Sequence, residues 1–203
     1  MRDFFDKLLL FITVLVIALF LIFGAIYAYG EEATSCESRV RESIQELQPW
    51  YYQSRDLATL SRRTEQLTQL TNAICNASRE TKIDPILAVA IAFRESSLHP
   101  IVGRGERDGK RGERGYFQVM PGSSAERFAP LDCSQHDPEC NAKTALRFMS
   151  FLRDKCDNTW SWVGSYGRGV KCPDIEIARE WSEVRLARRY LCKIGDCDSI
   201  WPE

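Results

Sequence analysis

The longest apolar run of the chain lies near its N-terminus and extends from Leu8 to Tyr29 without a charged residue. A transmembrane helix needs roughly 20 such residues, whereas the apolar core of a cleaved signal peptide has about 7–15. The run therefore predicts an uncleaved membrane anchor within residues 1–30. Cleavage at the small-x-small spacing of Ala28 and Gly30 is the alternative.

The charges beside this run predict its orientation. Arg2 and Lys7 precede it, and Glu31 and Glu32 follow it. Positive residues mark the cytoplasmic side of a membrane span, and acidic residues count little. We therefore expect a short cytoplasmic stub, with everything after residue 30 outside the cytoplasm.

Residues 31–72 form a polar tether and a helical segment in this interpretation. After the tether at 31–37, apolar residues at intervals of three or four indicate a helix that Pro49 ends. A second helix carries a heptad-like seam at Leu57, Leu60, Thr64, Leu67, Thr71 and Ile74. Such a seam is typical of a coiled-coil partner helix, but its short length and its threonines favour packing on the chain's own domain.

A helix of unusual composition follows. Asp84 and Pro85 are good residues for a helix N-cap and first position. Every residue from Ile86 to Phe93 is apolar, and a helix that is apolar on all sides is buried. The polar residues 94–97 end the helix before Pro100.

The remaining chain predicts a mainly α-helical fold. Residues 103–114 are rich in glycine and charge and indicate an exposed loop, with a small hairpin near 103–118. Amphipathic helices are expected from Ala142 to Leu152 and over about 174–191.

Eight cysteines all follow the apolar run, and an even number in an exported domain indicates disulfide bonds. Eight cysteines allow 105 pairings, so closeness in the sequence gives only the simplest assignment. That assignment is Cys133–Cys140, Cys156–Cys172, Cys192–Cys197 and, from the remaining two, Cys36–Cys75. Zinc is disfavoured because His99 and His136 form no zinc-finger spacing with the cysteines. We expect no metal and no cofactor.

Charge argues against nucleic acid as the main partner. The chain has 27 basic and 28 acidic residues and a net charge of −1, without the basic surface that nucleic-acid binding requires. The glycines of loop 103–114 follow a helix, whereas a phosphate-binding loop follows a strand.

Glu95 is the residue whose position is most informative. It stands at the C-terminal end of the buried helix. Burial and the negative end of a helix both favour the protonated form of a carboxyl group. A protonated carboxyl group is what a general acid in glycoside cleavage needs.

Four segments around Glu95 follow one another in a characteristic order: 93–100, 115–121, 137–141 and 164–169. This order resembles the lytic transglycosylases of the soluble-lytic-transglycosylase type, relatives of goose-type lysozyme, over about residues 73–190. The resemblance implies a lysozyme-like helical domain within 73–203. It also implies cleavage of the β-1,4 bond between N-acetylmuramic acid and N-acetylglucosamine in peptidoglycan.

The resemblance assigns roles to individual residues. It implies that Glu95 is the general acid and base and that Ser96 orients the site. Tyr116 and Gln118 match the cleft-lining segment, and Tyr166 matches a tyrosine that hydrogen-bonds near the catalytic carboxyl group. Members of this family use one carboxyl group and release 1,6-anhydro ends without water.

Alternatives remain open on the sequence. Glu106, Asp108 and Glu113 lie in the loop and could reach the cleft, which would allow hydrolysis by two carboxylates. Gly167 stands where the family pattern has asparagine. A domain that binds glycan without cutting it, or a structural subunit of an envelope machine, is the third interpretation.

These predictions place the protein in the bacterial cytoplasmic membrane as a single-pass protein with its catalytic domain in the periplasm or outside. Its expected partners are peptidoglycan strands and the membrane, and an envelope-spanning complex is a candidate further partner. Wall turnover, division, secretion and conjugation all fit this placement.

Overall fold

The computed structural model describes the greater part of the chain after the apolar run. The described residues are 36–49, 56–103, 105–156, 159–169, 171–174, 177–178 and 182–193. None of the helices in these ranges is long and apolar enough to span a bilayer. The predicted anchor and Cys197 lie outside the described residues.

The chain divides into two compact units, Met1–Ser38 and Arg39–Glu203. Of the first unit only residues 36–38 are described, and they are helical. The second unit contains Glu95 and the other candidate cleft residues, and the following description concerns it, apart from Cys36 of the first unit.

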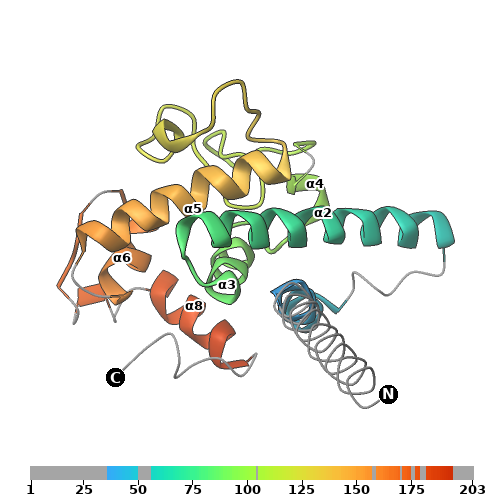
Figure 1. The fold of residues 1–203 in the computed structure, drawn as a ribbon, viewed down its shortest axis with the longest axis horizontal. Coiled ribbons are helices and arrows are strands. Elements are labelled where there is room, and N and C mark those ends of the chain that lie inside the picture. Colours follow the sequence, from blue (N-terminus) through green and yellow to red (C-terminus); the bar gives the residue numbers. More distant parts are fainter. Residues whose placement is uncertain are drawn as a thin grey trace, which may run out of the picture. The chain divides into compact units, whose positions relative to one another are not determined.

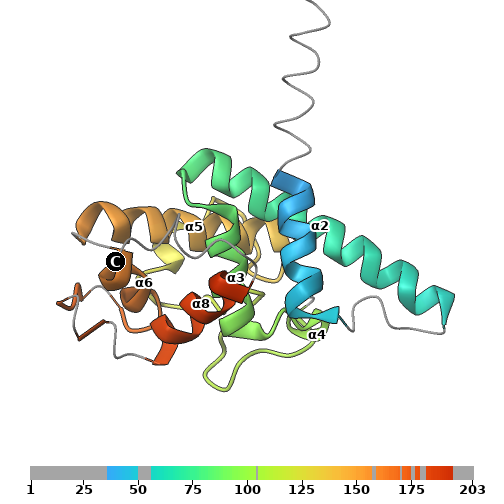
Figure 2. The ribbon, with the colours of Figure 1, turned by 90° about the horizontal axis from the view of Figure 1, so that it is seen from below.

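The second unit is built from helices, as the sequence predicted. After the helical residues up to 47, the elements follow in the order α2 (Leu57–Thr81), α3 (Pro85–Ser96), α4 (Pro100–Gly103), the 3-10 turn η2 (Glu126–Phe128), α5 (Pro138–Lys155), α6 (Thr159–Tyr166) and α8 (Ser182–Lys193). α2 and α5 lie side by side (Figure 1), α3 packs against both α2 and α8 (Figure 2), and α6 packs against α5. Instead of the expected hairpin, the described loops hold one isolated antiparallel bridge, between Arg114 and Val119.

α3 begins and ends as its sequence predicts. The Asp84 carboxylate accepts hydrogen bonds from the backbone N–H groups of Ile86 (2.7 Å) and Leu87 (3.1 Å). Every residue from Ile86 to Ala92 is buried. Ser97 ends the helix in the left-handed conformation, and its N–H donates to the carbonyl of Phe93.

α2 packs on its own domain through its C-terminal part. The seam residues Leu67, Thr71 and Ile74 are buried, whereas Leu57 is 81% exposed. The N-terminal turns of α2 extend beyond the other helices (Figure 1). The seam is therefore half core and half surface.

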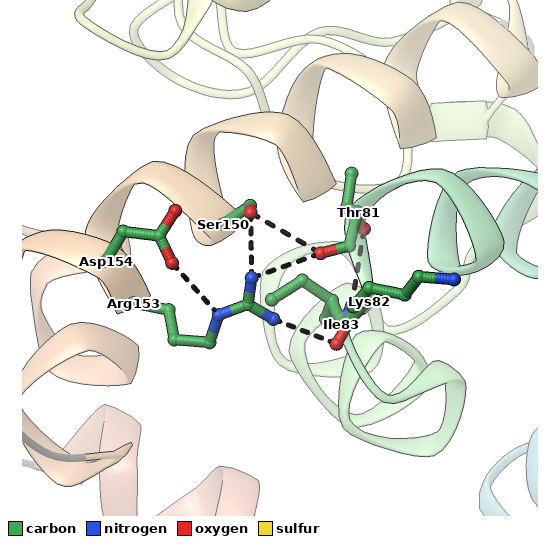
Figure 3. A network of polar contacts seen from close by, with 6 residues as sticks. All are labelled: Thr81, Lys82, Ile83, Ser150, Arg153 and Asp154. Carbon is green, nitrogen blue, oxygen red and sulfur yellow. Dashed lines mark hydrogen bonds and ion pairs between the residues drawn. The ribbon is translucent and has the colours of Figure 1, made fainter.

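A cluster of polar contacts fixes the C-terminal end of α2 to α5 (Figure 3). The Arg153 guanidinium donates to the carbonyls of Lys82 (2.9 Å) and Thr81 (3.3 Å) and to the Ser150 hydroxyl (3.1 Å). These carbonyls lie at a helix end, where the helix itself supplies no donors. Arg153 thus caps one helix from its neighbour.

Two of the expected disulfides are present. Cys133–Cys140 joins the preceding loop to the first turn of α5, and Cys156–Cys172 encloses α6. Cys36, Cys75 and Cys192 are also disulfide-bonded.

Three elements were not predicted: α4, η2 and α6. A last helix was expected over 174–191; in the structure residues 177–178 are helical, and α8 extends from Ser182 to Lys193.

We expect Arg153→Ala to lower the free energy of unfolding by about 1–3 kcal/mol, because carbonyls at the end of α2 lose their donor. Urea denaturation followed by circular dichroism measures this change. Arg79→Ala is the matched control, because Arg79 lies exposed near the same helix end. Equal effects of the two substitutions would contradict the capping role of Arg153.

Candidate active site

Glu95 opens onto a cleft of about 900 Å³. The side chain lies in the last turn of α3 and is 22% exposed. The cleft is walled by the loop after α4, by α5 and by the end of α6. Its lining residues are Glu95, Gly109, Lys110, Arg111, Glu113, Gln118, Val119, Met120, Gly122–Ala125, Phe148 and Tyr166–Gly169.

The cleft brings together three of the five predicted site residues, Glu95, Gln118 and Tyr166. Ser96 and Tyr116 are not among the lining residues. The Ser96 hydroxyl forms its hydrogen bonds at the C-terminal end of α3: it donates to the Ala92 carbonyl (2.9 Å) and accepts from the Leu98 N–H (3.1 Å). Ser96 therefore shapes the end of α3 rather than the cleft surface.

Tyr116 belongs to the core and not to the cleft wall. Its side chain is 2% exposed. Its ring packs so closely on Gly103 that a β carbon there would lie 2.1 Å from the ring. The prediction that Tyr116 lines the cleft is corrected accordingly, because an aromatic ring gains more from this apolar packing than from exposure.

Glu95 has a charged neighbour that the sequence reasoning missed. The Arg94 guanidinium forms an ion pair with Oε1 of Glu95 through Nη2, and the Arg94 side chain is only 6% exposed. A cation in the last turn also interacts favourably with the negative end of the helix. Arg94 thus stabilises the same carboxylate that burial and the helix end destabilise.

Tyr166 approaches Glu95 from α6. Its hydroxyl donates a hydrogen bond of 2.9 Å to the carbonyl of Phe117. Burial raises the pKa of Tyr166 well above its usual range, and the negative charge of Glu95 raises it further. Tyr166 therefore stays protonated and remains a hydrogen-bond donor at physiological pH.

The position of Tyr166 depends on how α6 is held. The Cys156–Cys172 disulfide closes the segment that contains the helix. The Ser165 hydroxyl also bonds to the carbonyls of Ser161 (2.8 Å) and Lys171 (2.5 Å). These links fix the helix end from which Tyr166 and Gly167 face the cleft.

The turn that carries Gln118 is held by Asn141 of α5. The Asn141 side chain is 1% exposed. Its Oδ1 accepts from the N–H of Phe117 (2.8 Å), and its Nδ2 donates to the carbonyl of Arg114 (3.0 Å). Gly115 has φ +70°, and a β carbon there would lie 2.4 Å from the Asn141 amide carbon. Position 115 therefore requires glycine for two reasons: its φ angle is positive, and a β carbon would clash with the Asn141 side chain.

Asn141 is a positioning residue that the sequence reasoning quoted only as part of a motif. The feature that could have identified Asn141 is its position in the first turn of a helix capped by Asp137, close in sequence to the cleft segments. Through Asn141, α5 sets the conformation of the neighbouring Gln118.

Gln118 adopts a left-handed conformation with φ +50°. Non-glycine residues rarely do so, and such strain concentrates at functional sites. Its Nε2 donates to the carbonyl of Gly115 (2.8 Å). A β carbon at Gly109 would lie 2.6 Å from Gln118 Oε1 and 2.3 Å from Glu113 Oε2, so both oxygens lie against that glycine.

Among the acidic residues of loop 103–114, Glu113 is the one that lines the cleft. It accepts from the backbone N–H of Arg111 (2.9 Å) and from Arg111 Nε (2.8 Å). The Arg111 backbone N–H is the main cause that lowers the pKa of Glu113. Asp108 lies near His136 instead, at 3.8 Å between its Oδ1 and the imidazole Nε2.

Comparison with known families confirms the resemblance. The family model described as Transglycosylase SLT domain matches residues 72–180. No curated protein and no solved structure matches the chain significantly. The matched segment includes α3, the cleft loop, α5 and α6.

We expect Asn141→Ala to lower the free energy of unfolding, because the Phe117 N–H and the Arg114 carbonyl each lose a hydrogen-bond partner. Leaving a buried polar group without a partner costs about 1–3 kcal/mol. Asn141→Asp keeps the acceptor for the Phe117 N–H but sets a carboxylate oxygen against the Arg114 carbonyl, so it should destabilise the protein at least as much. Urea denaturation measures both, and Asn76→Ala on the exposed face of α2 is the control. An Asn141→Ala effect as small as that of the control would show that Asn141 does not hold the turn.

Proposed function

The chain belongs to the transglycosylase SLT domain family, and from this premise we propose that Glu95 is its general acid and base in cleaving peptidoglycan glycan strands. The family indicates lytic transglycosylase activity on peptidoglycan at the family level. The catalytic residue, the product and the location of the protein are our proposals.

The observation that carries the proposal is the place of Glu95. It is the carboxyl group at the end of a buried helix, partly exposed to a cleft that a glycan strand could enter. A general acid must lie within hydrogen-bond reach of the bond it cleaves while being shielded from bulk water. The partial burial of Glu95 and its place in the cleft wall support this role.

The proposed reaction uses the proton of Glu95 twice. Glu95 first transfers its proton to the oxygen of the scissile β-1,4 bond, and that bond breaks. The N-acetyl group of the substrate helps to stabilise the positive charge at the anomeric carbon. The Glu95 carboxylate then takes the proton of the C6 hydroxyl as that oxygen bonds to the anomeric carbon, which gives a 1,6-anhydro end and restores Glu95.

The cleft supports this reaction with groups fixed before substrate binds. The protonated Tyr166 and the ion pair with Arg94 surround the carboxyl group, and Gln118 presents its amide to the same cleft. Groups fixed in advance need little reorganisation during the reaction.

Hydrolysis is the second candidate function, and Glu113 is the observation that favours it. Its lowered pKa keeps it a carboxylate at neutral pH, and it lines the same cleft as Glu95. A second carboxylate can activate water in an inverting glycosidase. In that case the products would carry reducing ends.

We further propose that residues 8–29 anchor the protein in the bacterial cytoplasmic membrane with the catalytic domain in the periplasm or outside. The disulfides of the second unit support an oxidising compartment. In this position the domain would open the wall locally, and an envelope-spanning complex is the candidate partner that would direct it.

We expect Glu95→Gln to reduce cleavage of purified peptidoglycan by more than the 10²–10⁴-fold that is typical of losing one acid–base step, because one group serves both steps. The glutamine keeps the shape and an oxygen that can accept from Arg94. Release of soluble muropeptides measures the rate, and circular dichroism checks the fold.

Glu65→Gln, on an exposed position of α2, is the matched control and should cleave at the wild-type rate. A Glu95→Gln variant that keeps more than about a tenth of the wild-type rate would refute Glu95 as the acid and base. A wild-type protein that binds peptidoglycan without cleaving it would favour the non-catalytic interpretation.

Glu113→Gln separates the two candidate reactions. Under transglycosylation we expect the rate to fall less than about tenfold, because the carboxylate takes no part in proton transfer. If Glu113 activates water, the loss should instead approach the 10²–10⁴-fold of a missing general base. The same release of muropeptides measures both outcomes.

A further inference from the structure

Arg94 is a buried charge in contact with the proposed catalytic carboxyl group, and the reaction as proposed gives it no defined role. Its side chain is 6% exposed, and its Nη2 contacts Oε1 of Glu95. Nη1 is buried without a hydrogen-bond acceptor among the described residues. A buried guanidinium is costly unless it is paired, so the ion pair with Glu95 is a substantial part of what holds Arg94 in this position.

Gly167 lies directly over this pair. A β carbon at Gly167 would be 3.1 Å from Arg94 Nη2 and 4.0 Å from Glu95 Oε1. The φ angle of Gly167 is not in the left-handed region, so its backbone does not require glycine. A side chain at this position would come into tight contact with Nη2, and the guanidinium would have to move by a few tenths of an ångström.

We infer that Arg94 is the positioning residue of Glu95 and that the absence of a side chain at Gly167 leaves the Arg94 guanidinium in its place beside the carboxyl group. The inference rests on the proposed function of Glu95 and adds to it how the carboxyl group is oriented. Arg94 holds Oε1, which leaves Oε2 as the oxygen that carries the reacting proton.

The charge of Arg94 matters at each proton transfer. When Glu95 gives its proton to the glycosidic oxygen, a negative charge appears in a partly buried position at the negative end of α3. Arg94 balances this charge until the C6 hydroxyl returns a proton to Oε2. Removing Arg94 should therefore make the proton of Glu95 harder to transfer and leave the Glu95 side chain free to rotate.

Other ionisable groups also face Glu95 and contribute to its pH response. They are Tyr166 from α6, Arg168 from the segment after it, and Lys110, Arg111 and Glu113 from the cleft loop. Arg94 is in direct contact with the Glu95 carboxylate, so a change at Arg94 should have a large effect.

The test compares Arg94→Gln, Arg94→Lys and Gly167→Ala with wild type and with the surface control Arg79→Gln, all as the full chain in detergent. Two quantities are measured: the pH dependence of peptidoglycan cleavage, and the carboxyl ¹³C NMR titration of Glu95, assigned by its loss in Glu95→Gln. The titration does not require activity.

For Arg94→Gln we expect the Glu95 titration and the alkaline limb of activity to move upward, because an opposite charge in contact with the carboxyl group is lost. We also expect the maximal rate to fall about 10–10²-fold from misplacement. Arg94→Lys should keep most of the titration but not the rate. Gly167→Ala should shift both in the direction of Arg94→Gln, and less far.

Unchanged titration and pH profile in both Arg94→Gln and Gly167→Ala would overturn the inference. If Arg94→Gln does not fold, the Glu95 titration of Gly167→Ala decides the question, because a methyl group at Gly167 meets Arg94 Nη2 first and the titration is measured without substrate. A different result would contradict the proposed function of Glu95 itself: peptidoglycan cleavage that persists in Glu95→Gln. The titration of Glu95 would still test the ion pair in that case.

Discussion

The burial of α3 is the constraint on which the rest of the structure depends. Its large side chains Ile86, Leu87, Val89 and Ile91 are at most 2% exposed, and each contributes about 1.5–3 kcal/mol by leaving water. A helix with no polar face can carry ionisable groups only at its ends. The Arg94–Glu95 pair therefore occurs at the last turn, where the helix meets the cleft.

The opposite wall of the cleft depends on polar contacts instead of apolar burial. A loop with little regular structure has many backbone groups to satisfy. Asn141 binds the turn from α5, and Tyr166 binds it from α6 through the Phe117 carbonyl. The same contacts that satisfy the backbone also bring Gln118 and Tyr166 to face Glu95. The residues that hold the loop in place are therefore also the ones that shape the cleft.

Local sequence signals predicted the elements that carry the site, but not its details. The cap at Asp84 and the apolar run between Ile86 and Phe93 were enough for α3, and the amphipathic pattern from Ala142 to Leu152 was enough for α5, because these signals act within a few turns. α6 was missed because its eight residues are too few to display a helical period.

Side-chain direction was the part that the sequence could not supply. In a tight turn neighbouring residues can face opposite ways, so Tyr116 enters the core while Gln118 lines the cleft. Adjacent residues of a helix do not normally face each other, so nothing in the pattern predicted that Arg94 contacts Glu95. Gly167, which follows α6, lies beside that contact, and only the fold shows this.

The central claim is that Glu95 both gives and recovers the proton without the help of water. Digestion of peptidoglycan by the full chain in ¹⁸O-labelled water tests it most directly, with the muropeptides analysed by mass spectrometry. The account predicts 1,6-anhydro ends, lighter by one water than hydrolysed ends and free of the label. Reducing ends that carry ¹⁸O at the anomeric carbon would contradict it.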